Sequence, residues 1–142
     1  MAWTAGHTEE RDVKKLPANA EAEINPHRIV TAGTLPGDIK QATAATQWPM
    51  GVSGDASLQH STKFAIGDQV DVKYDGVVYV EMSSTGSRGA VVAATSAGKG
   101  VTLAVSAGEE KYGIGFAMEA WTDGQIIPVM VDRMLVHGDT TG

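Results

Sequence analysis

Two glycine-rich motifs carry part of the pattern of a nucleotide site, and each lacks a residue that the site needs. Gly98-Lys99-Gly100 supplies the lysine of a phosphate-binding loop, but Ala93 stands where the first glycine belongs and Gly100 where a magnesium-binding hydroxyl belongs. Gly113-Ile114-Gly115 begins like a dinucleotide-binding fingerprint, but Met118 replaces its third glycine. The surrounding residues predict a strand, so we expect these glycines to let another backbone or a large side chain approach closely. No cofactor site is predicted.

The side chains that could act as nucleophiles or acids do not form a catalytic set. Ser53 lies in Gly51-Val52-Ser53-Gly54, which does not have the spacing of a nucleophile elbow. Paired carboxylates are the residue types of a glycosidase, but solvated carboxylates in turns and on surfaces are far commoner. The pairs in question are Asp68 with Asp71 and Glu109 with Glu110. The sequence predicts no catalytic residue, and the protein is not expected to be an enzyme.

The potential metal ligands are equally scattered. The chain has no cysteine, which excludes disulfides and thiolate metal sites and fits synthesis in a reducing cytoplasm. No two of its histidines have the spacing of metal ligands; they are His7, His27, His60 and His137. We therefore expect no metal site.

Trp48 is a candidate for binding a sugar. Carbohydrate-binding modules present aromatic platforms, and Trp48 beside Pro49 has the residue type for this role. A buried or interfacial tryptophan is the alternative, and it is the favoured interpretation.

Composition and charge exclude further classes of protein. A length of 142 residues indicates one domain, and no apolar run approaches the ~20 residues that span a bilayer. The first ten residues lack the basic and apolar regions of a secretory signal. The net charge is −6, and the basic cluster around Lys14 is offset by neighbouring acids, so no basic face for nucleic acid is expected. Membranes and nucleic acids are therefore excluded as direct partners.

The elements that remain are short alternating apolar runs separated by glycine-rich turns. Val70–Tyr74 leads through Asp75-Gly76 into Val77–Met82, and Tyr112–Trp121 leads through Asp123-Gly124 into Gln125–Val131. Asp-Gly between alternating runs predicts a hairpin, because glycine tolerates the positive φ of such turns. Further strands are predicted at residues 27–31, 39–42, 48–53, 89–94 and 101–105. About eight strands at spacings near ten residues predict an all-β fold, a small antiparallel barrel or sandwich.

The two ends of the chain differ from this pattern. Residues 1–24 are polar and charged, with a possible helix from Thr8 to Leu16 that Pro17 would end. They are predicted to be an N-terminal arm that becomes ordered on a neighbouring subunit or capsid protein, with a frayed terminus as the alternative. Residues 25–136 are predicted to be the β-rich binding domain, and residues 137–142 a flexible tail.

The order of motifs resembles that of the capsid cement, or head decoration, proteins of tailed bacteriophages. The likeness covers residues 25–135, while the first 24 residues have no counterpart and the loop from Ser57 to Phe64 is longer than usual. The segments that carry it are Gly51-Val52-Ser53, Gly67–Val72, Gly76–Val80, Gly89–Ala94, Ile114–Ala120 and Gly124–Val129.

The resemblance implies a function as well as a fold. It implies a β-tulip-like domain on the outer surface of the virion, made in the host cytoplasm, that bridges neighbouring major capsid proteins and stabilises the shell against DNA pressure. It also implies self-association, as a homotrimer or a dimer. A head-fibre base or a carbohydrate-binding module on the virion is the alternative. The residues predicted to supply protein contacts are Trp3, Val13, Leu16, Trp48, Met50, Met118 and Met130.

Overall fold

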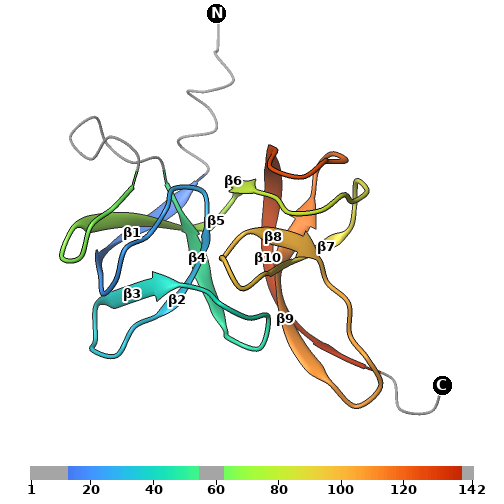
Figure 1. The fold of residues 1–142 in the computed structure, drawn as a ribbon, viewed down its shortest axis with the longest axis horizontal. Coiled ribbons are helices and arrows are strands. Elements are labelled where there is room, and N and C mark those ends of the chain that lie inside the picture. The colour runs from blue at the N-terminus through green and yellow to red at the C-terminus, as the bar shows by residue number, and fades with distance from the viewer. Residues whose placement is uncertain (1–12, 55–62, 139–142) are drawn as a thin grey trace, which may run out of the picture.

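The computed structural model describes residues 13–54 and 63–138, and in this part of the chain there are ten strands and no helix (Figure 1). The all-β prediction is therefore confirmed. The strands are β1 (Lys14–Ala20), β2 (Ile29–Ala32), β3 (Asp38–Gln41), β4 (Pro49–Ser53), β5 (Gln69–Asp75), β6 (Val77–Glu81), β7 (Val91–Ala94), β8 (Gly100–Thr102), β9 (Glu110–Ala117) and β10 (Ile126–His137).

The first five strands form a closed barrel in the order β1-β3-β2-β4-β5, drawn in blue to green in Figure 1. All of its neighbouring pairs are antiparallel except β1 and β3, which run parallel. Closure leaves no free edge in this part of the molecule. The barrel interior is filled by apolar side chains, namely Ala20, Ile24, Val30, Ile39, Phe64, Val70 and Val72.

Strand β1 corrects the prediction that residues 1–24 are an arm outside the core. Residues 14–20 pair with β5 along their length and with β3 at their end, and Ala20 and Ile24 are buried in the barrel. The helix predicted from Thr8 to Leu16 is wrong where it overlaps β1, and its earlier residues lie outside the described part. Strand β1 forms because it pairs with strands that are distant in the sequence, since few of its own residues are apolar.

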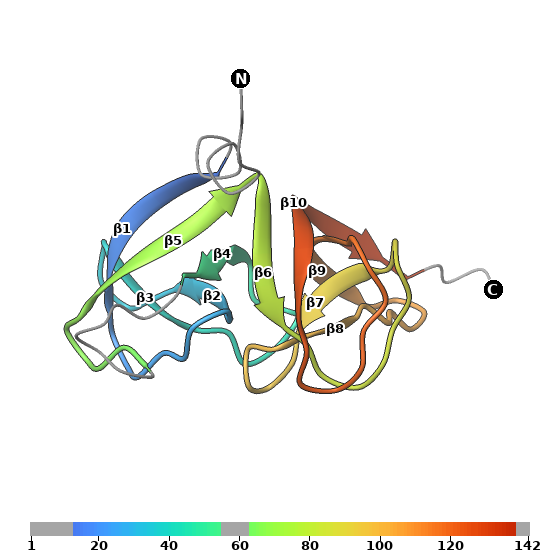
Figure 2. The same cartoon turned by 90° about the horizontal axis from the view of Figure 1, so that it is seen from above.

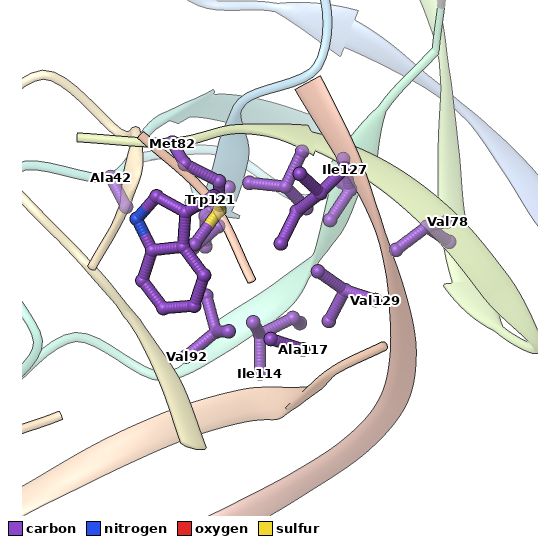
Figure 3. Packing of buried hydrophobic residues seen from close by; sticks show 12 residues of the cluster. Ala42, Val78, Met82, Val92, Ile114, Ala117, Trp121, Ile127 and Val129 are labelled. Atoms are coloured by element: carbon purple, nitrogen blue, oxygen red, sulfur yellow. The ribbon is translucent and has the colours of Figure 1, made fainter. Parts of the chain in front are cut away.

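The last five strands form a second sheet, the C-terminal sheet, in the order β6-β10-β9-β7-β8 (orange to red in Figure 1, apart from β6 and β7). It curls so that its two edges approach each other: Met82 bridges to Gly100, and the Ser83 N–H donates to the Gly100 carbonyl at 2.7 Å. The interior holds Trp121 together with aliphatic side chains from all sides (Figure 3). Ile29 and Val52 of the barrel belong to the same cluster, so the two halves pack against each other through these residues.

Only one of the two predicted Asp-Gly hairpins is present. Asp123-Gly124 lies between β9 and β10, which pair antiparallel, and Gly124 has a φ of 85°. Asp75-Gly76 also turns the chain, with a φ of 92° at Gly76, but β5 and β6 do not pair. Both edges of β5 are already occupied by β1 and β4, so the chain crosses from the barrel to the C-terminal sheet (Figure 2).

The C-terminal boundary also needs a correction. The prediction that a flexible tail begins at His137 is wrong, because His137 is the last residue of β10 and pairs with Glu110 of β9. Gly138 is buried and its N–H donates to the Glu109 carbonyl at 2.7 Å. Residues 139–142 lie outside the described part.

A charged cluster joins the barrel to the C-terminal sheet. The Glu81 carboxylate, at the end of β6, accepts from Arg28 Nη2 at 3.2 Å and from Lys99 Nζ at 3.1 Å. Arg28 immediately precedes β2 and also donates to the Ala97 carbonyl at 3.0 Å. Partial burial favours the neutral carboxyl, but the Lys99 hydrogen bond and the Arg28 charge outweigh it and hold the pKa of Glu81 below its ordinary value. The ionised carboxylate therefore stabilises the contact between the two halves.

Replacing Glu81 by glutamine should lower stability at neutral pH and weaken its dependence on acid. The lowered pKa means that ionised Glu81 stabilises the fold above the ordinary value of 4.5, and that this contribution disappears as the pH falls through the folded-state pKa. We expect Glu81→Gln to reduce the free energy of unfolding at neutral pH by about 1–3 kcal/mol, because the neutral amide keeps an acceptor oxygen but removes the negative charge that both Arg28 and Lys99 contact. The melting temperature, measured from about pH 6 to about pH 3, should then fall less in the variant than in the parent.

The exposed Glu119 provides the control for this prediction, because no hydrogen bond or ion pair holds it within the described part. Glu119→Gln should follow the parent curve. The carboxyls of Glu21 and Glu109 also have lowered pKa values, chiefly through hydrogen bonds from the backbone of Thr34 and Ser106, so some acid sensitivity should persist. Parallel curves for Glu81→Gln and the parent would contradict the assigned role.

Candidate protein-interaction surface

The outward side of the C-terminal sheet carries a set of large apolar side chains, which we term the outer face. Half of the ten large apolar residues that are exposed in the described part lie there, each between 37% and 47% exposed. They come from β6, the β9–β10 hairpin and β10: Tyr79, Phe116, Met118, Ile126 and Met130.

The strand register aligns these residues in adjacent rows. Val91, Phe116, Met130 and Val77 are direct cross-strand neighbours on β7, β9, β10 and β6. Residues that lie opposite each other in antiparallel strands project from the same side of the sheet, so these four form one row.

The second row lies beside the first. Pro128 is opposite Tyr79, and the Met118 N–H donates to the Pro128 carbonyl at 3.0 Å. Ile126 follows at the start of β10, opposite Glu81. The two complete rows contain no charged residue, and Glu81 lies at their border.

The strands that carry the outer face are apolar on both sides. Val78 and Val80 flank Tyr79 and are fully buried, as are Ile127 and Val129 on either side of Pro128. Their inward side already fills the core, so core packing does not explain the second apolar side. A contiguous apolar patch on a protein surface marks a site of interaction with another macromolecule. The outer face is therefore the candidate interaction surface.

The residues predicted to make protein contacts fall into separate places. Met118 and Met130 come together on the outer face. Leu16 and Met50 line an apolar groove of about 360 Å³ at the barrel. Trp48 lies at the junction of the two halves, beside Tyr112 and Arg133. Val13 is half-buried just before β1, and Trp3 lies outside the described residues.

Tyr79, Phe116 and Ile126 are contact candidates that the sequence alone did not single out. The signal was present in the continuous apolar runs Val77–Val80 and Ile126–Val131, which lack the apolar and polar alternation of a strand with one wet side. Such a run predicts a strand covered on both faces, but its own residues do not show what covers the second one.

The motifs with partial catalytic or nucleotide-binding patterns have structural roles in the described part of the chain. Ser53 is fully buried, and its hydroxyl donates to the Asn25 carbonyl and accepts from the Arg28 N–H. Lys99 is held by Glu81 rather than projecting from a phosphate loop. The close approach expected at Gly113-Ile114-Gly115 is confirmed: a Cβ on Gly115 would collide with the Met130 carbonyl oxygen.

The carboxylates of the Glu109 and Glu110 pair also have local partners. Glu109 accepts from the Ser106 N–H at 2.8 Å, and Glu110 lies 3.3 Å from His137 Nδ1. Within residues 13–54 and 63–138, no three of the histidine and acidic side chains come close enough together to hold a metal ion. The same residues contain no helix long and apolar enough to cross a membrane.

Comparisons with known proteins identify a neighbour in fold. No family model matches the chain, and no curated protein matches its sequence. Among solved structures, the chain is similar to the N base of the head fiber protein gp8.5 of bacteriophage phi29, with a TM-score of 0.64. The match covers 84% of this chain and 94% of that chain at 17% sequence identity. The matched part of this chain is long enough to include residues of both the barrel and the C-terminal sheet.

Proposed function

We propose that this protein is a structural component of a tailed-phage head, held on the outer surface of the capsid by its β domain. The observation that carries the proposal is the fold shared with the base of a head fiber over 84% of the chain. The motif order supports it independently, because it resembles that of capsid cement proteins. The function common to both kinds of protein is attachment to a phage head, and the major capsid protein is the partner that we propose.

The outer face supplies a surface suited to such attachment. Apolar area contributes about 25 cal/mol for each Å² that is removed from water, so the half-exposed phenylalanine, methionine and tyrosine side chains of the two rows can drive docking. The binding free energy of one such contact is modest, but many identical copies that bind one shell together are held more tightly through avidity. The proposal requires no cofactor, no metal and no catalysis.

The charge of the chain also suits the outside of a shell. The net charge of −6 gives no attraction to packaged DNA, and the proposed partners include neither nucleic acid nor membrane. The absence of cysteine agrees with synthesis in the host cytoplasm before assembly. Location on the outer capsid surface is therefore part of the proposal.

A protein held on the outside of a head can act as cement or as the base of a fibre, and an experiment can distinguish these two roles. A cement protein bridges neighbouring capsid proteins and opposes the DNA pressure, whereas a fibre base anchors an appendage. The fold comparison favours the base, and the resemblance in sequence favours cement. If adding this protein raises the temperature at which DNA-filled heads break, the protein has the cement role.

Self-association as a homotrimer, or as a dimer, is proposed with the same function. Uncovered strand edges do not require it, because the barrel is closed and the free edges of the C-terminal sheet approach each other at Met82 and Gly100. Association would instead use apolar faces. Light scattering on the purified protein tests this, and a monomer at micromolar concentration would overturn the trimer without affecting attachment to the head.

Sedimentation with phage heads tests the attachment itself. The purified full chain is mixed with heads of the phage that encodes it, from which this protein has been genetically deleted. We expect saturable co-sedimentation with intact heads and none with free DNA. A protein that stays in the supernatant at saturating concentrations would refute the proposed function.

A further inference from the structure

A second surface feature lies where the barrel meets the C-terminal sheet. It is an open cavity of about 470 Å³ that is lined mainly by polar and aromatic residues. Trp48 precedes β4, Tyr74 and Asp75 end β5, and the rest come from the middle of β10. The lining residues are Trp48, Tyr74, Asp75, Val131, Asp132 and Arg133.

The tryptophan of this cavity is exposed and yet held in place. Trp48 is 44% exposed, although burying a ring of this size is strongly favourable. Its carbonyl accepts from Thr31 Oγ1 at 2.8 Å, and its ring meets the Tyr112 ring edge to face with centroids 5.2 Å apart. The Arg133 guanidinium lies 5.8 Å from the ring centroid and is fixed by donation to the Met50 carbonyl at 3.1 Å. A fixed aromatic surface binds with little loss of side-chain entropy.

The acidic residues of the cavity are available to accept hydrogen bonds. Asp132 lies where the register of β10 shifts between Val131 and Met134, and such a bulge turns a side chain away from the regular alternation. Within the described part of the chain, no hydrogen bond or ion pair holds the Asp132 carboxylate. Asp75 accepts from the Gly76 N–H at 2.9 Å and lies 3.6 Å from Lys14 Nζ, in a pair that is more than half exposed. Both carboxylates retain free lone pairs.

These groups match the surface of a sugar ring. A pyranose presents an apolar face of C–H groups, which packs on an aromatic ring, and a rim of hydroxyls, which donate to carboxylates and accept from a guanidinium. The two carboxylates balance the Arg133 guanidinium and the Lys14 ammonium, so the cavity has no excess of positive charge to attract an acidic sugar or a nucleic acid. The polar, open lining also differs from the enclosed apolar pocket that holds a hydrophobic small molecule.

We propose that the cavity between Trp48 and Asp132 binds a neutral oligosaccharide built from hexopyranose units. Trp48 provides the stacking surface, Asp132 and Asp75 accept from the sugar hydroxyls, and Arg133 both supports the ring and donates. The proposal stands apart from attachment to the head, because the outer face contributes no residue to the cavity.

The test is a titration of the full-length protein, labelled with ¹⁵N, with five oligosaccharides. Maltotriose, cellotriose, tri-N-acetylchitotriose and lactose are the neutral probes, and trigalacturonic acid is the acidic one. We expect at least one neutral probe to shift the indole resonance of Trp48 and the amide resonances of Asp132 and Arg133 in a saturable manner. The acidic probe should bind more weakly.

Two variants and one control locate the site. Trp48→Ala should weaken binding of the neutral probe about tenfold or more through the lost ring contact. Asp132→Ala should weaken it by about the same factor, and it has no partner in the described part whose loss would disturb folding. Tyr79→Ala, on the outer face, should leave binding unchanged.

Several results would overturn the inference. They are the absence of saturable shifts with every neutral probe, shifts that lie on the outer face, or unchanged affinity in Asp132→Ala. Tighter binding of the acidic probe would also contradict the assignment to neutral sugars. None of these results affects the co-sedimentation experiment with heads, so either proposal can be refuted while the other stands.

Discussion

Replacing Met130 by glutamate should abolish binding to phage heads while leaving the protein folded. Met130 lies in the middle of the first outer-face row and is 43% exposed, so the free protein can hydrate a carboxylate there. Docking would remove that charge from water without a partner, at an expected penalty of several kcal/mol. We therefore expect the affinity for heads, measured by sedimentation, to fall about a hundredfold or more. The melting temperature should change little, because exposed substitutions have small effects on stability.

Ile66→Glu is the matched control for this prediction. Ile66 is 75% exposed, more than any other large apolar residue in the described part, and it lies in the segment before β5 on the barrel. The substitution adds the same charge to the same kind of surface, but outside the outer face. Head binding should survive it. Loss of binding in both variants would show that added negative charge, rather than the outer face, governs attachment.

Replacing Gly115 by alanine should destabilise the fold far more than replacing a glycine in an open turn. Gly115 lies on β9 against β10, and an added Cβ would collide with the Met130 carbonyl and lie 3.0 Å from the Asp132 nitrogen. The obstacle is backbone, which has no alternative rotamer to adopt. We expect a loss of about 3 kcal/mol or more in the free energy of unfolding, and a fall of about 10 °C in the melting temperature.

Gly124→Ala separates this clash from the ordinary effect of losing a glycine. Gly124 has a φ of 85°, and no atom lies within 4 Å of its added Cβ. Its substitution should cost only the strain of a left-handed alanine, about 1 kcal/mol. If Gly115→Ala proves no more destabilising than Gly124→Ala, the close approach of β9 to β10 is not as described.

Local patterns in the sequence identified most of the strands but not all of their partners. The alternation of Val70-Asp71-Val72-Lys73 and the Asp123-Gly124 turn predicted elements that depend on neighbouring residues. Asp75-Gly76 carries the same turn signal, yet the strands on either side of it separate, because β1 and β4 occupy both edges of β5. A two-residue turn does not show which distant strands will pair with the edges of the strand beside it.

The same limit applies to the surfaces. Met118 and Met130 are predicted contact residues, and the structure brings them together with Phe116 because the register of β9 and β10 aligns them. The cavity at Trp48 depends on a register shift in β10 that turns Asp132 toward residues more than 50 positions earlier in the chain. A register shift has no dependable sequence signal, so the aromatic residue could be identified as a possible ligand platform but its acidic partners could not.

The most direct test of the central claim is an electron cryomicroscopy reconstruction of phage heads saturated with this protein. The account predicts density for the barrel and the C-terminal sheet on the outside of the shell, with Phe116 and Met130 facing the capsid protein and the cavity at Trp48 facing solvent. Heads without such density, or density in which the outer face points into solvent, would contradict it.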